Sequence, residues 1–599
     1  MDRLHPLAWA APCKGRGKAV NATQVQVPHP LAMTFSECSG SHALGGDQGH
    51  HFDGTSHLQG RHGGLHSPSD PSRVGRQGRA KVESNAHGDQ DTSPVQDRGG
   101  CWRYSSGHAI NLNANDRRTC GGCSVFRCVG PGENWSRGRD AAARVFSLPF
   151  SSNLVRQADG AATCGLGKDW HRGRREELKR RLKTGVVVLR GMPEPRASLG
   201  FHQDKNFWYL TGVESPGVAF VMDLDTGREV LFVSKPSAFA ESWGGEIWDT
   251  DDEWVKELTG VQEVRANDAG RGGNRGLLEL LDELLGENSE RPIWTLQTSH
   301  VELSGAYDSA VPYDRAREKD SLDGRVSREA ALAGHLEVRY KEQGVKVKDL
   351  TPELWDMRVI KTDRELDAMR RASRSGALAI QEAIRSTRPD LGEWDIDSLI
   401  TWQQRRFGAT GPAYAAIVGS GVNSLVLHYN FSSRRMRAGE VVLVDFAPEV
   451  DHYVSDVTRT WPVSGVFSDE MIPIYDAVLA AQEAAIAQVK AGARMRDVSG
   501  AATKVLRERG YQCPHGISHS VGMAVHDPGG LGKTLKAGMV FTIEPGVYDK
   551  ATGIGVRIED VILVTEDGCE ILSADCPKER EAIEALMAEK GILDLIDVR

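Results

Sequence analysis

Hydrophobic and polar residues follow different patterns before and after about residue 146 of this chain. Up to residue 145, glycine, serine, histidine, aspartate and glutamine dominate, and no helical or strand period extends over more than a few positions. Such a segment buries too little apolar surface to offset the conformational entropy that ordering would cost. We therefore predict that residues 1–145 form a disordered extension, or an upstream sequence that is not part of the mature protein.

Strand and helix patterns alternate after residue 146. The run RREELKRRLKTG predicts an amphipathic helix closed by Gly185, and VVVLRG predicts a strand. The run VAFVMDLDTGREVLFVS predicts two strands joined by an Asp-Thr-Gly turn. Because this alternation continues to about residue 345, we predict an α/β domain over residues 146–347. A second folded domain, residues 348–599, opens with the long helical pattern of TPELWDMRVIKTDRELDAM.

A first acidic hairpin is predicted in GEVVLVDFAPEVDHYVSDVTRTWPV, with strands over 441–446 and 453–461. If the turn is centred near Val450 and Asp451, Asp445 and Asp456 are cross-strand partners. Like charges directly opposed on a sheet are destabilising unless a positive charge lies between them. The alternative is a solvated sheet face on which these acids pair with Arg459 or Arg557.

A second hairpin repeats this arrangement in MVFTIEPGVYDKATGIGVRIEDVILVT. With its turn near Ala551 and Thr552, Glu544 and Glu559 are again opposed across two strands. The alternative is again a solvated face, with Arg557 as the partner. A chain that twice places facing carboxylates in apolar strands is more consistent with a cation site, so we favour metal binding.

Three histidines lie between the two hairpins, in the segment CPHGISHSVGMAVHDPGG. A lone histidine there would more often be structural than a ligand. A neutral imidazole, however, adds a directional metal ligand without adding charge to a site that already holds four carboxylates. We therefore expect at least one of His515, His519 and His526 to be a ligand.

Composition excludes two classes of function. The chain has 599 residues, with 73 Lys and Arg against 82 Asp and Glu, which gives a formal net charge of −9. A dedicated nucleic-acid binder should carry a basic face, and Arg434, Arg435 and Arg437 by themselves indicate only a solvated turn. A run of about 18 apolar residues would be needed to span a membrane. The sequence contains none, so we predict neither nucleic-acid nor membrane partners.

Seven of the ten cysteines precede residue 165. Cys120, Cys123 and Cys128 resemble part of a zinc site, but a second pair at suitable spacing is not evident. Histidines of the extension, such as His50 and His51, could bind metal loosely. The three later cysteines do not suggest a disulfide framework, and the reducing cytoplasm is the predicted compartment.

The second domain resembles the catalytic domain of the pita-bread metallopeptidases, the family of aminopeptidase P, prolidase and methionine aminopeptidase. The resemblance covers roughly residues 350–590, and the preceding domain resembles the amino-terminal domain of aminopeptidase P, especially over residues 201–223. It implies an α/β domain followed by an α+β pita-bread (creatinase/aminopeptidase) catalytic domain. The matching segments are LVLHYN, VDFAPEVDHYVSDVTRTWPV, HGISHSVGMAVHDPGG, TIEPGVY and GVRIEDVILVT, with FHQDKNFWYLTGVESPGVAFVMD in the first domain.

This resemblance implies two divalent metal ions held by five residues. Asp445 would belong mainly to one ion and His519 with Glu544 to the other, while Asp456 and Glu559 would bridge them. The family usually works with manganese, sometimes with cobalt or zinc. An oxygen-rich ligand set suits manganese, so two Mn²⁺ ions are the predicted cofactors.

The resemblance also implies how the remaining residues act. His428 and His526 would contact the substrate or the tetrahedral intermediate, and His515 and Arg557 would line or brace the site. A metal-bridging hydroxide would attack the scissile carbonyl, with Glu544 shuttling the proton. The predicted activity is release of the amino-terminal residue from peptides with proline in the second position. Relatives of this kind commonly form dimers or tetramers, and we expect a homodimer or homotetramer here.

Other members of the same fold remain as alternatives. Prolidase, which cleaves Xaa-Pro dipeptides, is the runner-up, although the run QDKNFWYLTG favours aminopeptidase P. Methionine aminopeptidase lacks such a large preceding domain, and creatinase works without this metal set. A non-catalytic binding protein on the same fold is disfavoured because all five ligand positions are filled. Trp208 and Tyr209 could reach a neighbouring subunit, but we expect them to fill a local core.

One position departs from the family pattern. The family usually has Asp-Ala-Gly or Asp-Ser-Gly at the first aspartate, whereas this chain has Asp445-Phe446-Ala447. Side chains alternate along a strand, so Phe446 should point away from the face that carries Asp445. The departure therefore concerns the strand packing behind the site, and we expect the ligand itself to be preserved.

Overall fold

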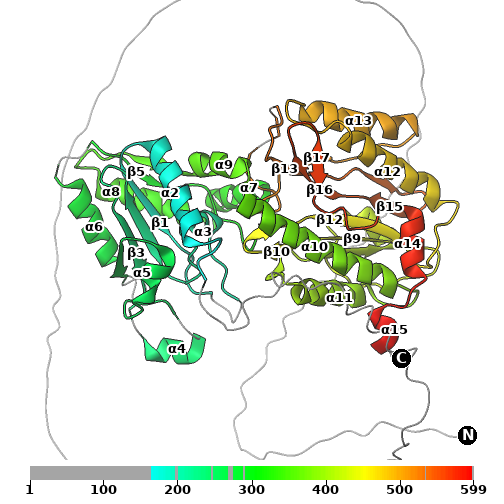
Figure 1. Cartoon of the computed structure of the whole chain (residues 1–599), viewed down its shortest axis with the longest axis horizontal. Coiled ribbons are helices and arrows are strands. Elements are labelled where there is room, and N and C mark those ends of the chain that lie inside the picture. Colours follow the sequence, from blue (N-terminus) through cyan, green and yellow to red (C-terminus); the bar gives the residue numbers. More distant parts are fainter. Residues whose placement is uncertain are drawn as a thin grey trace, which may run out of the picture. The chain divides into compact units, whose positions relative to one another are not determined.

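The computed structural model describes residues 163–195, 200–235, 237–244, 247–267, 274–287, 290–529, 531–532 and 534–596. All of them belong to one compact unit, Cys128–Arg599. The predicted extension, with its histidines and the Cys120, Cys123 and Cys128 group, lies outside the described residues. The described chain forms two lobes, which we call the amino-terminal lobe (residues 163–349) and the carboxyl-terminal lobe (residues 351–596) (Figure 1).

A six-stranded mixed sheet forms the centre of the amino-terminal lobe. Its order is β4-β3-β2-β1-β5-β6, with antiparallel pairing from β1 through β3 and parallel pairing of the outer strands. The predicted strands around the Asp-Thr-Gly turn are present as β2 and β3. The strands are β1 (Val186–Arg190), β2 (Ala219–Asp223), β3 (Glu229–Val233), β4 (Glu263–Ala266), β5 (Ile293–Thr295) and β6 (Val347–Asp349).

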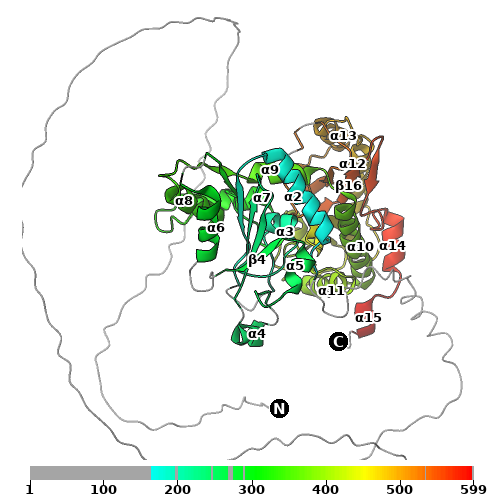
Figure 2. The same ribbon diagram turned by 60° about the vertical axis from the view of Figure 1, so that its left-hand side comes forward.

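Helices cover both faces of this sheet, as the α/β prediction requires (Figures 1 and 2). Apolar residues of α2, α3 and α5 pack on one face, and those of α6 and α8 pack on the other. Trp208 and Tyr209 of α3 are buried in the first of these cores, which confirms the local-core interpretation. The helices are α2 (Lys168–Leu182), α3 (Lys205–Thr211), α4 (Ala238–Gly244), α5 (Trp254–Thr259), α6 (Arg275–Leu285), α7 (Tyr307–Lys319) and α8 (Arg328–Arg339).

Helix α2 ends earlier than predicted. It stops at Leu182, and Lys183 has a positive φ of 69°, so the helix is not closed by Gly185. The backbone N–H of Lys183 still donates to the carbonyl of Lys179, which satisfies one of the last carbonyls of the helix. In the part of the chain that the structure describes, none of the helices is both long and apolar enough to cross a membrane.

The carboxyl-terminal lobe consists of small antiparallel sheets covered by long helices. The sheets that carry the acidic residues are β12-β9-β8, β13-β16-β17 and β14-β15. The strands are β7 (Gly411–Pro412), β8 (Ile417–Ser420), β9 (Val441–Phe446), β10 (Pro448–Val450), β11 (Tyr453–Val454), β12 (Val457–Pro462), β13 (Val540–Ile543), β14 (Gly546–Asp549), β15 (Ile554–Arg557), β16 (Asp560–Val564) and β17 (Cys569–Ile571). The helices are α9 (Thr351–Val359), α10 (Asp363–Ser386), α11 (Glu393–Arg406), η2 (Gly421–Leu425), α12 (Met471–Ile486), α13 (Met495–Glu508), α14 (Arg580–Met587) and α15 (Ile592–Ile596).

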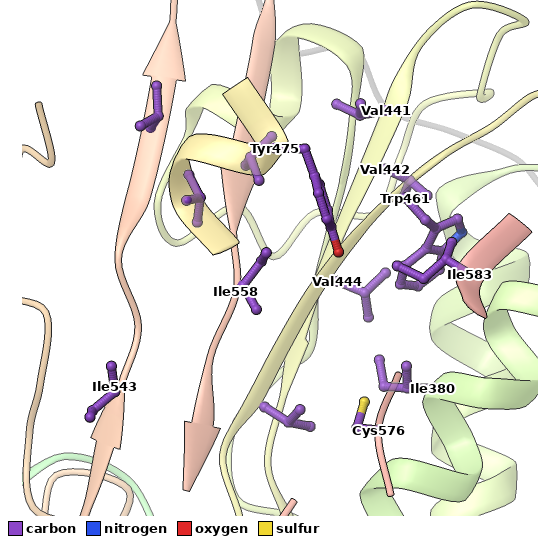
Figure 3. Packing of buried hydrophobic residues seen from close by; sticks show 14 of the residues in the cluster. Ile380, Val441, Val442, Val444, Trp461, Tyr475, Ile543, Ile558, Cys576 and Ile583 are labelled. Atoms are coloured by element: carbon purple, nitrogen blue, oxygen red, sulfur yellow. The ribbon is translucent and has the colours of Figure 1, made fainter. Parts of the chain in front are cut away.

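One large apolar core lies between these sheets and helices. Val442, Val444 and Phe446 of β9 belong to it, together with Ile380 of α10 and Trp461 of β12 (Figure 3). Phe446 is fully buried there, on the side of β9 opposite to that of Asp445. The unusual Asp-Phe-Ala sequence is thus accommodated by the core, as predicted.

The first acidic hairpin has a different register from the predicted one. Strand β9 pairs with β12 so that Asp445 lies opposite Thr458 and not opposite Asp456. The turn is centred between Asp451 and His452, both of which have positive φ (49° and 63°), as in a type I′ two-residue loop. The turn is therefore one residue later than predicted, and this shifts the cross-strand pairing by two residues.

Asp445 and Asp456 nevertheless share one face of the hairpin. Antiparallel partners point to the same side of a sheet, and so do residues two apart along an extended chain. Because Thr458 is the partner of Asp445, Asp456 lies diagonally across from Asp445 on the same face. The prediction of direct opposition is wrong, whereas the two carboxylates still converge.

The second acidic hairpin has the predicted register. Ile543 pairs with Asp560, and Gly546 pairs with Arg557, so the pairing is in phase on both sides of a short interruption. Glu544 and Glu559 occupy opposed positions in this interruption. The last pair before the turn is Asp549 with Ile554, which centres the loop between Ala551 and Thr552 as predicted.

Candidate metal centre

Three side chains from separate elements converge at the centre of the carboxyl-terminal lobe. Ligand atoms of Asp456, His519 and Glu559 all lie within 4.8 Å of one another. His519 Nε2 is 3.5 Å from Asp456 Oδ2, 3.8 Å from Glu559 Oε1 and 3.4 Å from Glu544 Oε1. The structure thus brings four of the five predicted ligands into direct proximity.

Asp445 joins this group through Tyr414. The Tyr414 hydroxyl lies 2.5 Å from Asp445 Oδ1 and 2.8 Å from Asp456 Oδ1, and so donates between the two carboxylates. The other oxygen of Asp445 accepts a bond of 2.5 Å from Arg557 Nη2. Arg557 therefore pairs with one of the acids, as the solvated-face alternative requires, but both residues are buried. Arg459 donates to the side chain of Asp560 and to the backbone carbonyl of Glu559, but not to the carboxylate of any predicted ligand.

Negative charge is in excess among these buried acids. Burial, and secondly the charge of Asp445, hold the pKa of Asp456 well above its usual range. Burial, and then the charges of Asp456 and Glu544, do the same for Glu559. Burial also raises the pKa of Glu544, although Arg557 opposes that shift. Carboxylates that repel one another in a buried site need an additional cation to stay ionised near neutral pH.

His519 is oriented as a metal ligand would be. Its Nδ1 lies 3.0 Å from the carbonyl oxygen of Val525, so the ring donates its proton there. The lone pair of a neutral Nε2 then faces carboxylate oxygens, a contact that is unfavourable unless a cation lies between them. Thr458 Oγ1 donates to Glu559 Oε2 at 2.7 Å and fixes that carboxylate. The donor set therefore fits divalent cations.

His515 and Arg557 form a chain of hydrogen bonds at one edge of the cluster. Arg557 Nη1 donates to the Tyr548 hydroxyl at 2.9 Å, and that hydroxyl lies 3.0 Å from His515 Nε2. His515 Nδ1 is 4.0 Å from Glu544 Oε2. The structure thus places both predicted bracing residues beside the cluster, and it connects them through Tyr548.

The two remaining histidines differ in their surroundings. His526 stacks on His519 with ring centroids 3.9 Å apart and an interplanar angle of 15°. Its Nδ1 is 2.6 Å from Asp308 Oδ2 of the amino-terminal lobe. His428 is exposed in the turn after η2, and within the described residues no hydrogen bond or ion pair joins it to the carboxylates. The roles of both histidines stay predictions.

The sequence analysis gave no role to three residues whose side chains contact predicted site residues in the structure. Tyr414 lies 31 positions before Asp445, and its segment, GPAYAAIV, carries no signal of its own. Tyr548 belongs to the quoted TIEPGVY motif but received no role. Asp308 belongs to the other lobe and follows no recognisable pattern. Each is placed by tertiary contacts that neither periodicity nor spacing encodes.

The Tyr414 hydroxyl should matter for metal affinity. Tyr414→Phe removes the donor shared by Asp445 and Asp456, and we expect metal affinity and kcat to fall by about tenfold, as is typical when a partner of a metal ligand is lost. Titration of the metal-free protein with Mn²⁺, followed by kinetics, measures both. Tyr429→Phe is the matched control, because its hydroxyl donates to Glu393 outside the cluster. Equal affinities in the two variants would contradict the expected role.

Comparisons with known proteins give two matching family profiles and several similar enzymes. The profile of Metallopeptidase family M24 matches residues 367–566, and that of the Aminopeptidase P N-terminal domain matches residues 171–277. Xaa-Pro aminopeptidase of Escherichia coli is 30% identical over 454 residues, covering 69% of this chain and 96% of the relative. Xaa-Pro aminopeptidase 3 of Mus musculus is 30% identical over 423 residues (64% and 76%), and human Xaa-Pro dipeptidase is 28% identical over 475 residues (67% and 88%).

Solved structures give the same result. E. coli aminopeptidase P with the inhibitor Pro-Leu has a TM-score of 0.58 and 28% identity, covering 70% of this chain and 98% of that chain. The zinc-substituted form of the same enzyme, in complex with product, has a TM-score of 0.59 and 27% identity, with the same coverage. These matches span both lobes and the acidic hairpins. The chain therefore belongs to metallopeptidase family M24, among the Xaa-Pro aminopeptidases.

Proposed function

We propose that this protein releases the amino-terminal residue from peptides with proline in the second position. The observation that carries the proposal is the convergence of His519 Nε2 with the buried carboxylates of Asp456, Glu544 and Glu559, in a chain whose relatives are Xaa-Pro aminopeptidases. Cleavage of Xaa-Pro dipeptides is less favoured, because the dipeptidase relative has the lower identity.

The five predicted ligands would hold two divalent cations. Asp456 and Glu559 would lie between them, with Asp445 on one side and His519 and Glu544 on the other. Bound there, the cations would lower the pKa of water and polarise the scissile carbonyl. We propose Mn²⁺ because four of the five ligands are carboxylates, which suit a harder ion than zinc.

We propose that Glu544 moves a proton, and the surroundings of its two carboxylate oxygens support this role. Its Oε1 faces His519, while its Oε2 lies 4.0 Å from His515 Nδ1 at the edge of the cluster. One carboxylate oxygen can therefore serve the cations while the other exchanges a proton with the substrate.

His526 and His428 would contact the substrate, and His515 and Arg557 would brace the site. His526 stacks on His519, so a peptide carbonyl at the cations would lie near its ring. Although Arg557 is buried, the nearby charge of Asp445 holds the pKa of this guanidinium above its usual range. Arg557 therefore stays charged and offsets part of the negative charge of the site. His428 lies on an exposed turn, where it would meet the peptide as it enters.

We also propose the cytoplasm as the compartment and a dimer or tetramer as the assembled form. The four cysteines within the described residues are all free, which suits a reducing environment. One relative, 28% identical over 458 residues, is the mitochondrial Intermediate cleaving peptidase 55 of Arabidopsis thaliana. Localisation of the tagged full chain would distinguish the two compartments, and light scattering of the purified protein would measure its assembly.

The proposed activity can be tested with three peptides. We expect the full-length, manganese-loaded protein to release alanine from Ala-Pro-Ala, much more slowly from Ala-Ala-Ala, and hardly at all from the dipeptide Ala-Pro. The Asp456→Asn variant, with one predicted ligand removed, should be inactive on all three. Cleavage of Ala-Pro alone would make the protein a dipeptidase. Cleavage of Ala-Ala-Ala at the rate of Ala-Pro-Ala would contradict the proline preference.

A further inference from the structure

One carboxylate from the amino-terminal lobe reaches a histidine at the metal centre. Asp308 lies in the first turn of α7, and its Oδ2 is 2.6 Å from His526 Nδ1. The His526 ring lies flat against that of His519, with centroids 3.9 Å apart. Asp308 therefore touches no predicted ligand, yet it is only one side chain away from the cluster.

The loop that carries His526 is held by the same segment of the amino-terminal lobe. The backbone N–H of Val525 donates to the Ser304 carbonyl at 2.8 Å, and that of Tyr307 donates to the His526 carbonyl at 3.4 Å. The side chain of Tyr307 also packs against Ala524 in a small buried cluster. Backbone position around His526 is therefore fixed without Asp308, and only the imidazole ring depends on that carboxylate.

A carboxylate at Nδ1 decides which ring nitrogen carries the proton. Since carboxylate oxygens only accept hydrogen bonds, His526 must donate its Nδ1–H to Asp308. In the neutral ring, Nε2 then has the lone pair, on the edge of the imidazole away from Asp308. The stacking on His519 fixes the plane of the ring, and the bond to Asp308 fixes its rotation within that plane.

We propose that Asp308 is a positioning residue for peptide hydrolysis, holding His526 in the tautomer and orientation that present Nε2 to the substrate. This inference rests on the proposed role of His526 at the substrate. The Asp308 side chain is 64% exposed and that of His526 is 33% exposed. An exposed hydrogen bond of this kind contributes little to folding stability, so its main effect concerns the direction of the ring.

Kinetics of three variants of α7 test the proposal. We expect Asp308→Ala to lower kcat by about tenfold while KM changes by less than about twofold, because the group lost acts on the substrate through the Nε2 acceptor of His526. Asp308→Asn should recover most of the activity, since its amide oxygen can accept the same bond. Asp314→Ala, on the same helix but paired with Arg317, is the matched control and should resemble the wild type.

A double-mutant cycle separates positioning from a general structural effect. His526→Ala should lower kcat by about 10²-fold, the usual contribution of a positioned acid–base group. If Asp308 acts only through His526, adding Asp308→Ala to His526→Ala should cause no more than about a twofold further loss. A full additional tenfold loss in the double variant would overturn the proposal, as would a kcat for Asp308→Ala equal to that of Asp314→Ala.

A second measurement needs neither substrate nor metal. Histidine nitrogen NMR of the metal-free, full-length protein should show the His526 proton on Nδ1, and Asp308→Ala should shift it toward Nε2; an unchanged tautomer would contradict the inference.

The kinetics use whichever peptide the wild type cleaves. Cleavage of peptides without proline would contradict the proposed specificity alone, whereas full activity of His526→Ala would overturn both the role of His526 and that of Asp308.

Discussion

Replacing Asp456 with asparagine is expected to reduce peptide hydrolysis by at least about 10³-fold, equivalent to about 4 kcal/mol of transition-state stabilisation. Asp456 lies at the centre of the cluster, 3.5 Å from His519 Nε2 and bonded by Tyr414. An amide cannot supply the negative charge that two divalent cations require from a shared ligand. Metal content per chain should therefore fall together with kcat, and elemental analysis of the purified variant measures it.

The same substitution should stabilise the metal-free protein against heat. In the wild type, burial and the nearby charge of Asp445 make ionised Asp456 unfavourable. Asparagine removes this charge but keeps the volume and the ability to accept a bond from Tyr414. A variant that is more stable than the metal-free wild type but inactive would distinguish a metal site from a structural ion pair.

Asp560→Asn is the matched control, with the opposite expected sign. Asp560 is equally buried, but Arg459 and Lys578 outweigh the effect of burial and hold its pKa at about 2. Removing this carboxylate leaves Arg459 buried without its ionic partner, which typically costs about 3–5 kcal/mol. If Asp456→Asn destabilises the metal-free protein as Asp560→Asn does, the interpretation that these carboxylates need an additional cation is wrong.

Metal should stabilise the protein more at pH 8 than at pH 5. The folded-state pKa values of Asp456, Glu544 and Glu559 are raised above those of the unfolded chain. In the metal-free protein, the folded state therefore binds more protons than the unfolded state. These three carboxyl groups contribute their full stabilisation of the folded state below about pH 4, and this contribution is lost as the pH rises through their raised pKa values. Cations reverse this loss because they favour the ionised carboxylates.

Thermal unfolding with Mn²⁺ and with a chelator, at both pH values, measures this linkage. At a free metal concentration of 100 times Kd, we expect a stabilisation of about 2.7 kcal/mol. Subtracting the free energy of unfolding of Asp456→Asn from that of the wild type removes the contribution of the other titrating groups of the chain. A metal-free stability difference that does not change with pH, or that grows in favour of the wild type toward pH 8, would contradict the predicted linkage.

The sequence determined much of the site by itself. The alternation of apolar and acidic residues predicted β9 and the strands around Glu544 and Glu559. Facing carboxylates in apolar strands have few roles other than cation binding, so the same pattern predicted a metal site. The second hairpin was predicted in its true register, since its turn lies midway between two matching strand patterns. The burial of Phe446 behind Asp445 likewise followed from the two-residue period of a strand.

The turn of the first hairpin could not be placed correctly from the local sequence pattern. Asp451 and His452 both adopt positive φ, a conformation for which the sequence carries no glycine or asparagine signal. A turn misplaced by one residue shifts every pair by two. Because a shift of two preserves the face, Asp456 still joined Asp445, although not as its direct partner.

The tertiary structure alone decided which residues orient the ligands. The shared hydrogen bond from Tyr414, the link from Arg557 through Tyr548 to His515, and the contact of Asp308 with His526 join elements that are up to 218 positions apart in the chain. Side-chain periodicity describes only neighbours along one element, whereas these contacts depend on how strands and lobes pack together. The predicted ligands could therefore be inferred from the sequence, while the groups that orient their side chains could be found only in the fold.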